Sequence, residues 1–195
     1  MEIAVVDYKG GNVQSVLFAL ERLGATATLT ADPETLRKAD KVLFPGEGEA
    51  ASAMAALRAA GLDRVLPTLT QPFLGICLGM QLLGEHSEEN DTAMLGLLPF
   101  KVRRFVPDAA HKVPHMGWNN LQSLQGPLFA GLTEADHVYF VHSYYAPVGS
   151  YTTAQSVHPA PFSAAVQHGN FHGVQFHTEK SGAAGTRILA NFLNL

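Results

Sequence analysis

The first half of the chain alternates short apolar runs with stretches in which apolar residues recur at helical spacing. The apolar runs predict buried strands over residues 3–6, 26–30, 41–44 and 72–76. The amphipathic stretches predict helices over residues 13–23, from 32–33 onward, over 50–60 and over 78–85. Because strands that alternate with helices are typical of βαβ units, we expect a mostly parallel central sheet.

The second half of the chain is richer in aromatic and β-branched residues, which favour strands. Five such runs are separated by Pro, Gly or Asn: KVRRF, HVYFVHSYY, YTTAQSV, FSAAVQHG and FHGVQFH. We expect several of them to pair antiparallel. A closing helix over residues 183–192 places Ile188, Leu189 and Phe192 along one face. The pattern therefore predicts an α/β fold with additional antiparallel strands in its second half.

Length and composition narrow the class of protein. The 195 residues are 47% hydrophobic, which favours one globular domain spanning residues 1–195. The net charge is −4 and the 13 Lys and Arg form no run, so we expect no nucleic-acid partner. No stretch reaches the ~20 apolar residues of a membrane span. The single cysteine and the absence of a signal-peptide pattern lead us to expect a cytoplasmic protein without a membrane partner.

The only cysteine, Cys77, lies between Gly75 and Gly79 where a predicted strand turns into a helix. A small buried hydrophobic residue is one interpretation, since free cysteines are commonly buried. The spacing G-x-C-x-G also matches a nucleophile elbow, in which a strained turn exposes a reactive side chain. The positive end of the following helix would then favour a thiolate, and the N–H of Leu78 could face an oxyanion.

A nucleophile of this kind needs a base, and His177 is the strongest candidate among the nine histidines. It is followed two positions later by Glu179, and residues i and i+2 of an extended chain project to the same side. Glu179 could thus orient His177 toward a thiol, as in a catalytic triad. The alternative is a surface ion pair at a strand end.

A metal site would be a different use of the same histidines. His168, His172 and His177 are closely spaced, and histidine is a common zinc ligand. However, no second cysteine supplies a thiolate, and residues 168–172 have the pattern of a β-turn with a histidine on each side. We therefore expect neither a metal nor another cofactor.

Two motifs together resemble those of a known family. GICLGMQLL and GVQFHTEKS are similar to the nucleophile and His-x-Glu motifs of class I, or triad-type, glutamine amidotransferases. The resemblance covers the whole chain and implies a flavodoxin-like, three-layer fold. It also implies that Cys77 attacks the side-chain amide of L-glutamine, that His177 acts as base and then as acid, and that Glu179 orients His177.

The same resemblance implies where substrate and oxyanion bind. FPGEGEA would supply the second oxyanion donor from the backbone of Gly46, Glu47 and Gly48, beside that of Leu78. Because a carboxylate facing inward would repel the oxyanion, we expect the Glu47 side chain to point outward. The remaining positions implied to hold the substrate glutamine are Gln81, His142, Ser143 and Tyr144.

Further motifs narrow the resemblance. VVDYKGGNVQSV, PHMGWNN, YFVHSYY and HTEKS resemble the glutaminase subunits of imidazole glycerol phosphate synthases, enzymes of histidine biosynthesis. Two positions depart from that pattern, because Lys9 and Thr178 stand where Gly and Pro are usual. The resemblance implies a heterodimer with a (β/α)8-barrel cyclase subunit, which receives ammonia and forms imidazole glycerol phosphate and AICAR. The positions implied at that interface are Asn12, Trp118, Asn119, Tyr139 and Lys180.

Other readings stay open at this stage. The chain could be the glutaminase partner of another synthase, such as pyridoxal phosphate synthase, or a free-standing cysteine hydrolase. It could also be a binding module that retains the fold without the chemistry. For Trp118, ordinary core packing is as reasonable as a place at an interface.

Overall fold

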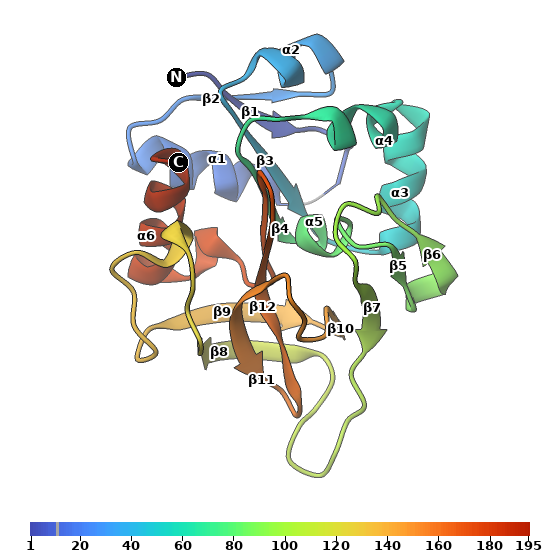
Figure 1. The fold of residues 1–195 in the computed structure, drawn as a ribbon, viewed down its shortest axis with the longest axis vertical. Coiled ribbons are helices and arrows are strands. Elements are labelled where there is room, and N and C mark those ends of the chain that lie inside the picture. Colours follow the sequence, from blue (N-terminus) through green and yellow to red (C-terminus); the bar gives the residue numbers. More distant parts are fainter. Residues whose placement is uncertain (11) are drawn as a thin grey trace.

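A central seven-stranded sheet organises the computed structural model, which describes residues 1–10 and 12–195 (Figure 1). Its strands follow the order β11-β12-β13-β4-β3-β1-β2, and all neighbours from β13 to β2 are parallel. The two remaining pairs, β11 with β12 and β12 with β13, are antiparallel. The strand bounds are β1 Ile3–Val6, β2 Ala27–Thr30, β3 Lys41–Gly46, β4 Phe73–Cys77, β11 Thr152–Val157, β12 Pro161–His168 and β13 Phe171–Val174.

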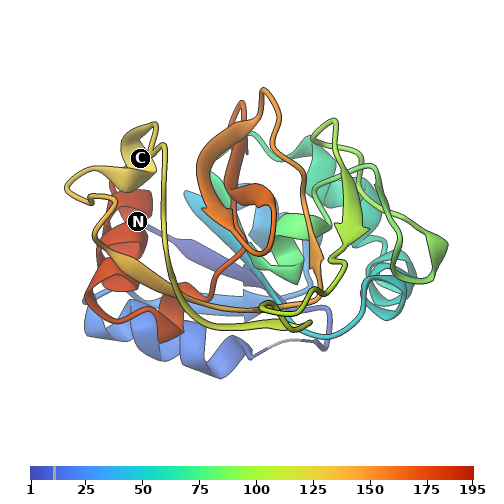
Figure 2. The same cartoon turned by 90° about the horizontal axis from the view of Figure 1, so that it is seen from below.

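Helices cover both faces of this sheet, which gives the expected three layers (Figure 2). Residues of α2, α3, α4 and α5 pack with one side of β1 and β3, whereas residues of α1 and α6 pack with the other side. The helix bounds are α1 Val13–Arg22, α2 Pro33–Lys38, α3 Ala50–Ala59, α4 Leu62–Val65, α5 Leu78–Gln81 and α6 Gly182–Leu193. Short 3-10 turns occupy η1 Leu66–Thr68, η2 Glu89–Asp91, η3 Pro127–Phe129 and η4 Thr178–Lys180.

The predicted parallel strands and their helices are confirmed with small shifts at their ends. Asp32 caps α2, because its carboxylate accepts from the Thr35 backbone N–H at 2.8 Å. In α6, Ile188, Leu189 and Phe192 are all buried, as the spacing predicts. The helix expected over residues 78–85 is wrong in length, since α5 ends at Gln81. The chain then turns at Gly84, which packs so tightly on Phe100 that a side chain there would clash.

Two smaller sheets border the carboxyl ends of the parallel strands. One has the order β10-β7-β5-β6, and the other pairs β8 with β9 antiparallel. Their bounds are β5 His86–Ser87, β6 Thr92–Ala93, β7 Lys101–Arg104, β8 His115–Asn120, β9 His137–His142 and β10 Tyr144–Tyr145. We did not predict β8, because Trp118 is the one strand-favouring residue in its sequence HMGWNN, beside a glycine and two asparagines.

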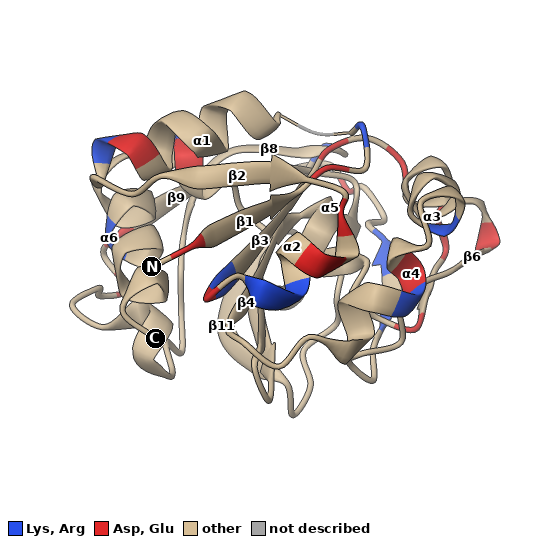
Figure 3. Ribbon diagram, turned by 90° about the horizontal axis from the view of Figure 1, so that it is seen from above, with Lys and Arg blue, Asp and Glu red and all other residues tan. Residues whose placement is uncertain are grey.

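Acidic and basic residues are both spread over the part of the chain that Figure 3 shows from above. Across residues 1–10 and 12–195, no helix is both long and apolar enough to cross a membrane.

Candidate active site

Cys77 is the last residue of β4 and stands on the predicted strand-to-helix turn. Its φ of 54° is unusual for a residue with a side chain, which is the strain expected of a nucleophile elbow. The flanking glycines make the turn possible. A Cβ on Gly79 would lie 1.8 Å from the Phe44 carbonyl oxygen, and a Cβ on Gly75 would lie 2.6 Å from that of Gly79. Sequence and geometry therefore agree on why glycines flank this cysteine.

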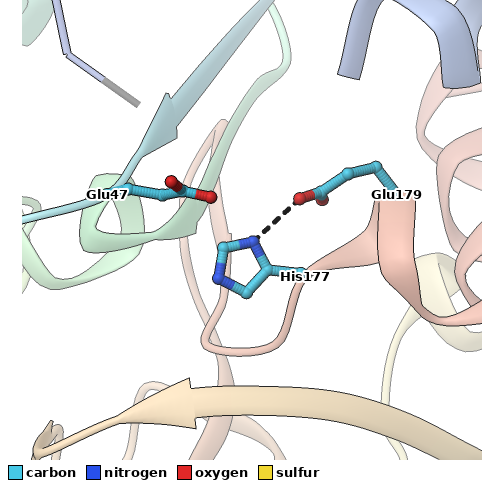
Figure 4. Close-up of side chains that lie close together, drawn as sticks. All are labelled: Glu47, His177 and Glu179. Carbon is cyan, nitrogen blue, oxygen red and sulfur yellow. Dashed lines mark hydrogen bonds and ion pairs between the residues drawn. The ribbon is translucent and has the colours of Figure 1, made fainter. Parts of the chain in front are cut away.

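His177 and Glu179 form a buried pair beside the elbow. His177 Nδ1 lies 2.8 Å from Glu179 Oε1, and the side chains are only 3% and 1% exposed. The alternative of a surface ion pair is therefore wrong. Our reason for expecting the contact was also wrong, because Glu179 belongs to the η4 turn and not to an extended strand. The turn brings the carboxylate back onto the imidazole (Figure 4).

The charges on each side of His177 decide its protonation. Burial on its own lowers the pKa of His177, but the Cys77 thiol and the Glu179 carboxylate outweigh burial and raise it to about 10. Since the carboxylate can only accept, Nδ1–H is the donor to Glu179, and Nε2 is left for the sulfur. The protonated ring therefore places a positive charge beside Cys77, which is the kind of neighbour that a cysteine nucleophile requires.

A cleft of about 490 Å³ opens above Cys77. It brings together most of the residues that the sequence predicted for catalysis and substrate binding: Glu47, Gly48, Cys77, Leu78, Gln81, His142, Ser143, Tyr144 and His177. Gly46 and Glu179 lie behind this cleft, in a small cavity that Glu47 and His177 also line. A glutamine-sized substrate could thus enter on one side of His177 while Glu179 stays on the other.

The Glu47 side chain is 40% exposed, but its carboxylate lies beside His177 and does not point away from the site, contrary to our expectation. Its carboxylate lies beside the His177 ring and faces the carboxylate of Glu179 (Figure 4), with an oxygen 3.5 Å from Lys180 Nζ. The cation of Lys180 and the protonated ring of His177 attract it more strongly than our argument from the oxyanion allowed. Both cations also offset the repulsion that this carboxylate would exert on an oxyanion.

The potential metal ligands are arranged differently from the set that we considered. Among the described residues, the only group of three with close ligand atoms is Glu47, His177 and Glu179, with these atoms within 4.8 Å of one another. His177 Nδ1 already donates to Glu179, and Lys180 adds a positive charge beside Glu47, so this group is unsuited to a cation. His168 is exposed at the end of β12 and His172 is buried in β13.

The far wall of the cleft is built on a chain of buried hydrogen bonds. Gln81 Nε2 donates to the Tyr144 carbonyl at 2.9 Å, and His142 Nδ1 donates to the same oxygen at 2.7 Å. His142 Nε2 then accepts from His115 Nδ1 at 3.0 Å. Burial lowers the pKa of His142 to about 3 and that of His115 to about 4, so both rings are neutral. The side chain of His142 therefore supports the backbone of Tyr144.

Two residues of this wall were missed by sequence reasoning. Gln175 is completely buried next to Cys77, and His115 lies behind His142. A polar residue inside the apolar run VQF could have drawn attention to Gln175, because buried polar groups need partners. His115 gave no comparable signal, since its strand was itself not predicted.

The residues predicted at a partner interface are only partly gathered. Trp118 is 57% exposed with its ring 6.0 Å from that of Tyr139, so the alternative of core packing is wrong. Lys180 lies on η4, two residues before Gly182, where an added Cβ would lie 3.9 Å from the Trp118 ring. Asn119 faces the other side of β8, where it donates to the Val157 carbonyl at 3.0 Å. Asn12 lines the small cavity behind His177.

Fold and site together are those of a cysteine-dependent amidotransferase. The family described as Glutamine amidotransferase class-I matches residues 4–195, and the chain belongs to this family. A solved structure titled glutamine amidotransferase superimposes with a TM-score of 0.76 at 20% identity, over 98% of this chain and 97% of that one, and it shares the fold.

Two relatives are more closely similar. Imidazole glycerol phosphate synthase subunit HisH of Bacteroides thetaiotaomicron is 52% identical over 196 residues, which is 100% of both chains. Imidazole glycerol phosphate synthase subunit HisH 2 of Legionella pneumophila is 50% identical over 194 residues, which is 99% of this chain and 98% of the relative.

Proposed function

We propose that this chain is the glutaminase subunit of an imidazole glycerol phosphate synthase. In this role it hydrolyses L-glutamine to glutamate and ammonia without a cofactor. The observation that carries the proposal is the buried arrangement of Cys77, His177 and Glu179 at the cleft. The full-length likeness to subunits of that synthase supports the choice over the pyridoxal phosphate enzyme.

The geometry supports a two-stage reaction. The Cys77 thiolate attacks the side-chain carboxamide carbon, a C–S bond forms, and the carbonyl oxygen becomes an oxyanion. Backbone N–H groups of Leu78 and of the segment Gly46 to Gly48 stabilise that oxyanion. The imidazolium of His177 gives its proton to the departing nitrogen as the C–N bond breaks, which leaves a thioester and ammonia.

Hydrolysis of the thioester uses the same groups in reverse. His177, now neutral, accepts a proton from water while the water oxygen attacks the thioester carbon. The second oxyanion collapses, the C–S bond breaks, and glutamate leaves with the thiolate and the imidazolium restored. Glu179 keeps its contact with Nδ1 throughout, so that Nε2 always faces the reacting sulfur.

The ammonia produced here would be consumed by a second, cyclase subunit, to which we assign the exposed Trp118 and its neighbours Tyr139 and Lys180. A closed passage between subunits keeps ammonia unprotonated and hence nucleophilic. We propose that Asn12 and Asn119 act near that contact, although Asn119 faces inward from β8. The resulting heterodimer would function in the cytoplasm.

The test is glutamate formation from glutamine by the purified chain, alone and with a cyclase subunit and its nucleotide ligand. We expect a rate that rises with the cyclase and falls by about 10⁴-fold or more in Cys77→Ala, because the covalent pathway is lost. Activity that depends on Cys77 but ignores the cyclase would discard the synthase assignment. Near-normal activity of Cys77→Ala would discard the chemistry.

A surface variant separates partner binding from chemistry. Trp118→Ala should weaken binding of the cyclase by about tenfold or more, since exposed aromatic residues are frequent anchors of interfaces. Leu29→Ala, which removes a 41% exposed side chain from β2, is the matched control. Equal affinity of both variants for the cyclase would contradict the assigned surface.

A further inference from the structure

Gln175 is a buried polar residue that the two-stage reaction does not yet use. It follows β13 directly, is fully buried, and places its amide between Cys77 and Gln81. Its Nε2 lies 3.7 Å from Cys77 Sγ, within reach of a hydrogen bond to sulfur. Its Oε1 lies 2.9 Å from Gln81 Nε2. No other glutamine amide among the described residues contacts the sulfur.

The direction of this hydrogen bond is fixed by the partners behind it. The Tyr144 carbonyl can only accept, so the atom of Gln81 that lies 2.9 Å away must be its nitrogen. Gln81 Nε2 has a second N–H, which points at Gln175. The atom of Gln175 that receives this N–H must therefore be its amide oxygen. The amide nitrogen of Gln175 is consequently left facing Cys77, and it can only donate.

The series of hydrogen bonds that ends at Gln175 starts from a firmly held acceptor, the Tyr144 carbonyl. Besides Gln81, the Tyr144 carbonyl accepts from the buried ring of His142, which is held by His115. His115 in turn lies 3.3 Å from Asn119 Nδ2 on β8. Turning the Gln175 amide by 180° would set its N–H groups against the N–H of Gln81 and leave these donors without an acceptor, at a cost of about 1–3 kcal/mol for each such group.

We propose that Gln175 is a further catalytic residue, which donates a hydrogen bond to the Cys77 sulfur and stabilises its thiolate, with Gln81 as the residue that positions it. Cys77 as a residue is only 7% exposed, so few water molecules can solvate a charge on its sulfur. The positively charged ring of His177 lies beside Cys77, and Gln175, directly after β13, supplies a hydrogen-bond donor to the sulfur. The thiolate is formed twice, before attack and again when the thioester breaks, and Gln175 serves both occasions. This inference rests on the proposed glutaminase chemistry.

The first test measures the thiolate without glutamine. Cys77 is the only cysteine, so the rate of its alkylation by iodoacetamide against pH reports its ionisation alone. Gln175→Met keeps the length of the side chain and removes the donor, and Gln175→Asn keeps an amide that is too short to reach. Both should move the midpoint of the profile upward by about one pH unit, the effect of one hydrogen bond to a charged group.

Two further readouts exclude a merely structural effect. The kcat for glutamine should fall about tenfold in both variants while KM changes less than about threefold, because the lost contact is to the nucleophile and not to the substrate. Gln167→Met is the matched control: Gln167 lies on β12, paired with His172 of β13, and should keep the parent profile. A midpoint that stays within about 0.2 pH units of the parent in a folded Gln175 variant would overturn the proposal.

A measurement on the unchanged chain covers the case in which neither variant folds. The side-chain amide resonances of Gln175 should shift with the same midpoint as the alkylation profile, and the shift should vanish in Cys77→Ala. Resonances that ignore the ionisation of Cys77 would overturn the proposal. Because alkylation and resonance shifts need no turnover, a chain without any glutaminase activity would refute the proposed function and leave this contact testable.

Discussion

The nucleophile and the base of this site are held in place by different means. Cys77 is fixed by its backbone, since it has a φ of 54° on a turn that closes only because Gly75 and Gly79 have no side chains. His177 has an ordinary extended backbone, with φ −84° and ψ 105°. Its position depends on hydrogen bonds: the ring donates to Glu179, and the carbonyl oxygen of His177 accepts a hydrogen bond from Ser181 Oγ.

This difference indicates how each half of the site should respond to substitution. The nucleophile half is Cys77 with Gly75 and Gly79, and the base half is His177 with Glu179 and Ser181. A backbone held by close contact does not tolerate an added side chain, because a new methyl group meets a main-chain atom that cannot move away. A side chain held by hydrogen bonds and charges can lose one partner and keep its place, with a graded loss of function. The nucleophile half should therefore lose its fold, whereas the base half should lose activity, or stability at acid pH, by degrees.

The largest effect is expected from Gly79→Ala, which attacks the backbone of the nucleophile half. The new Cβ would lie 1.8 Å from the Phe44 carbonyl oxygen, so β3 and α5 must separate. We expect a loss of about 4 kcal/mol or more in the free energy of unfolding, measured by urea denaturation. Gly24→Ala is the control: it has open space but a φ of 74°, and should cost only about 1 kcal/mol. Equal losses in both variants would contradict the role of close contact.

Glu179→Gln tests the base half without changing its shape. The ring of His177 keeps an acceptor but loses the negative charge that helps to raise its pKa. We expect kcat for glutamine to fall about 10²-fold while the free energy of unfolding changes far less than in Gly79→Ala. Glu34→Gln, on the exposed face of α2, should leave kcat unchanged. A fall of less than about threefold in Glu179→Gln would show that the charge is dispensable.

The buried histidines behind the base half should make stability depend on pH. His115 and His142 have pKa values of about 4 and about 3 in the fold, below their ordinary 6.5, so the unfolded chain binds protons first as the pH falls. The free energy of unfolding is therefore at its full value above pH 6.5. Below that pH it decreases by about 1.4 kcal/mol per pH unit for each ring. Urea denaturation between pH 7.5 and about 4.5 measures this slope.

A variant assigns that slope to a ring. His142→Asn places an amide N–H near the position of Nδ1, so it can still donate to the Tyr144 carbonyl but does not titrate, and the slope should decrease by about 1.4 kcal/mol per pH unit. His137→Gln, at the exposed start of β9, should keep the slope of the parent chain. If both variants kept it, protonation elsewhere in the fold would have to explain the acid sensitivity.

The smallest effect is expected from Thr178→Pro, which gives the base half some of the backbone rigidity of the nucleophile half. Thr178 opens the η4 turn, where proline is well accommodated, and its buried hydroxyl has no partner. We expect a gain of about 0.5–1 kcal/mol, seen as a Tm higher by about 2–4 °C. Thr178→Ala removes only the hydroxyl and separates the two contributions. A lower Tm for Thr178→Pro would indicate that the turn needs a φ that proline cannot adopt.

The sequence alone determined the parallel half of the fold and the nucleophile. Hydrophobic periodicity located β1, β3 and β4 with their helices, and the glycines around Cys77 indicated a strained turn, because both signals depend on residues close together in the chain. It also indicated His177 and Glu179, although the contact arises from the η4 turn and not from an extended strand. The resemblance to the family implied further residues that line the cleft, among them Gln81, His142 and Tyr144.

Only the tertiary structure decided which distant groups meet. The strand β8, the ion pair of Glu47 with Lys180, and the hydrogen bonds that lead from His115 through Gln81 to Gln175 all depend on contacts between separate elements. Such contacts have no period in the sequence, since a buried polar side chain is stabilised by whichever donor or acceptor the fold brings to it. Local patterns thus determined where the reactive cysteine lies, and the packing of separate elements decided what surrounds it.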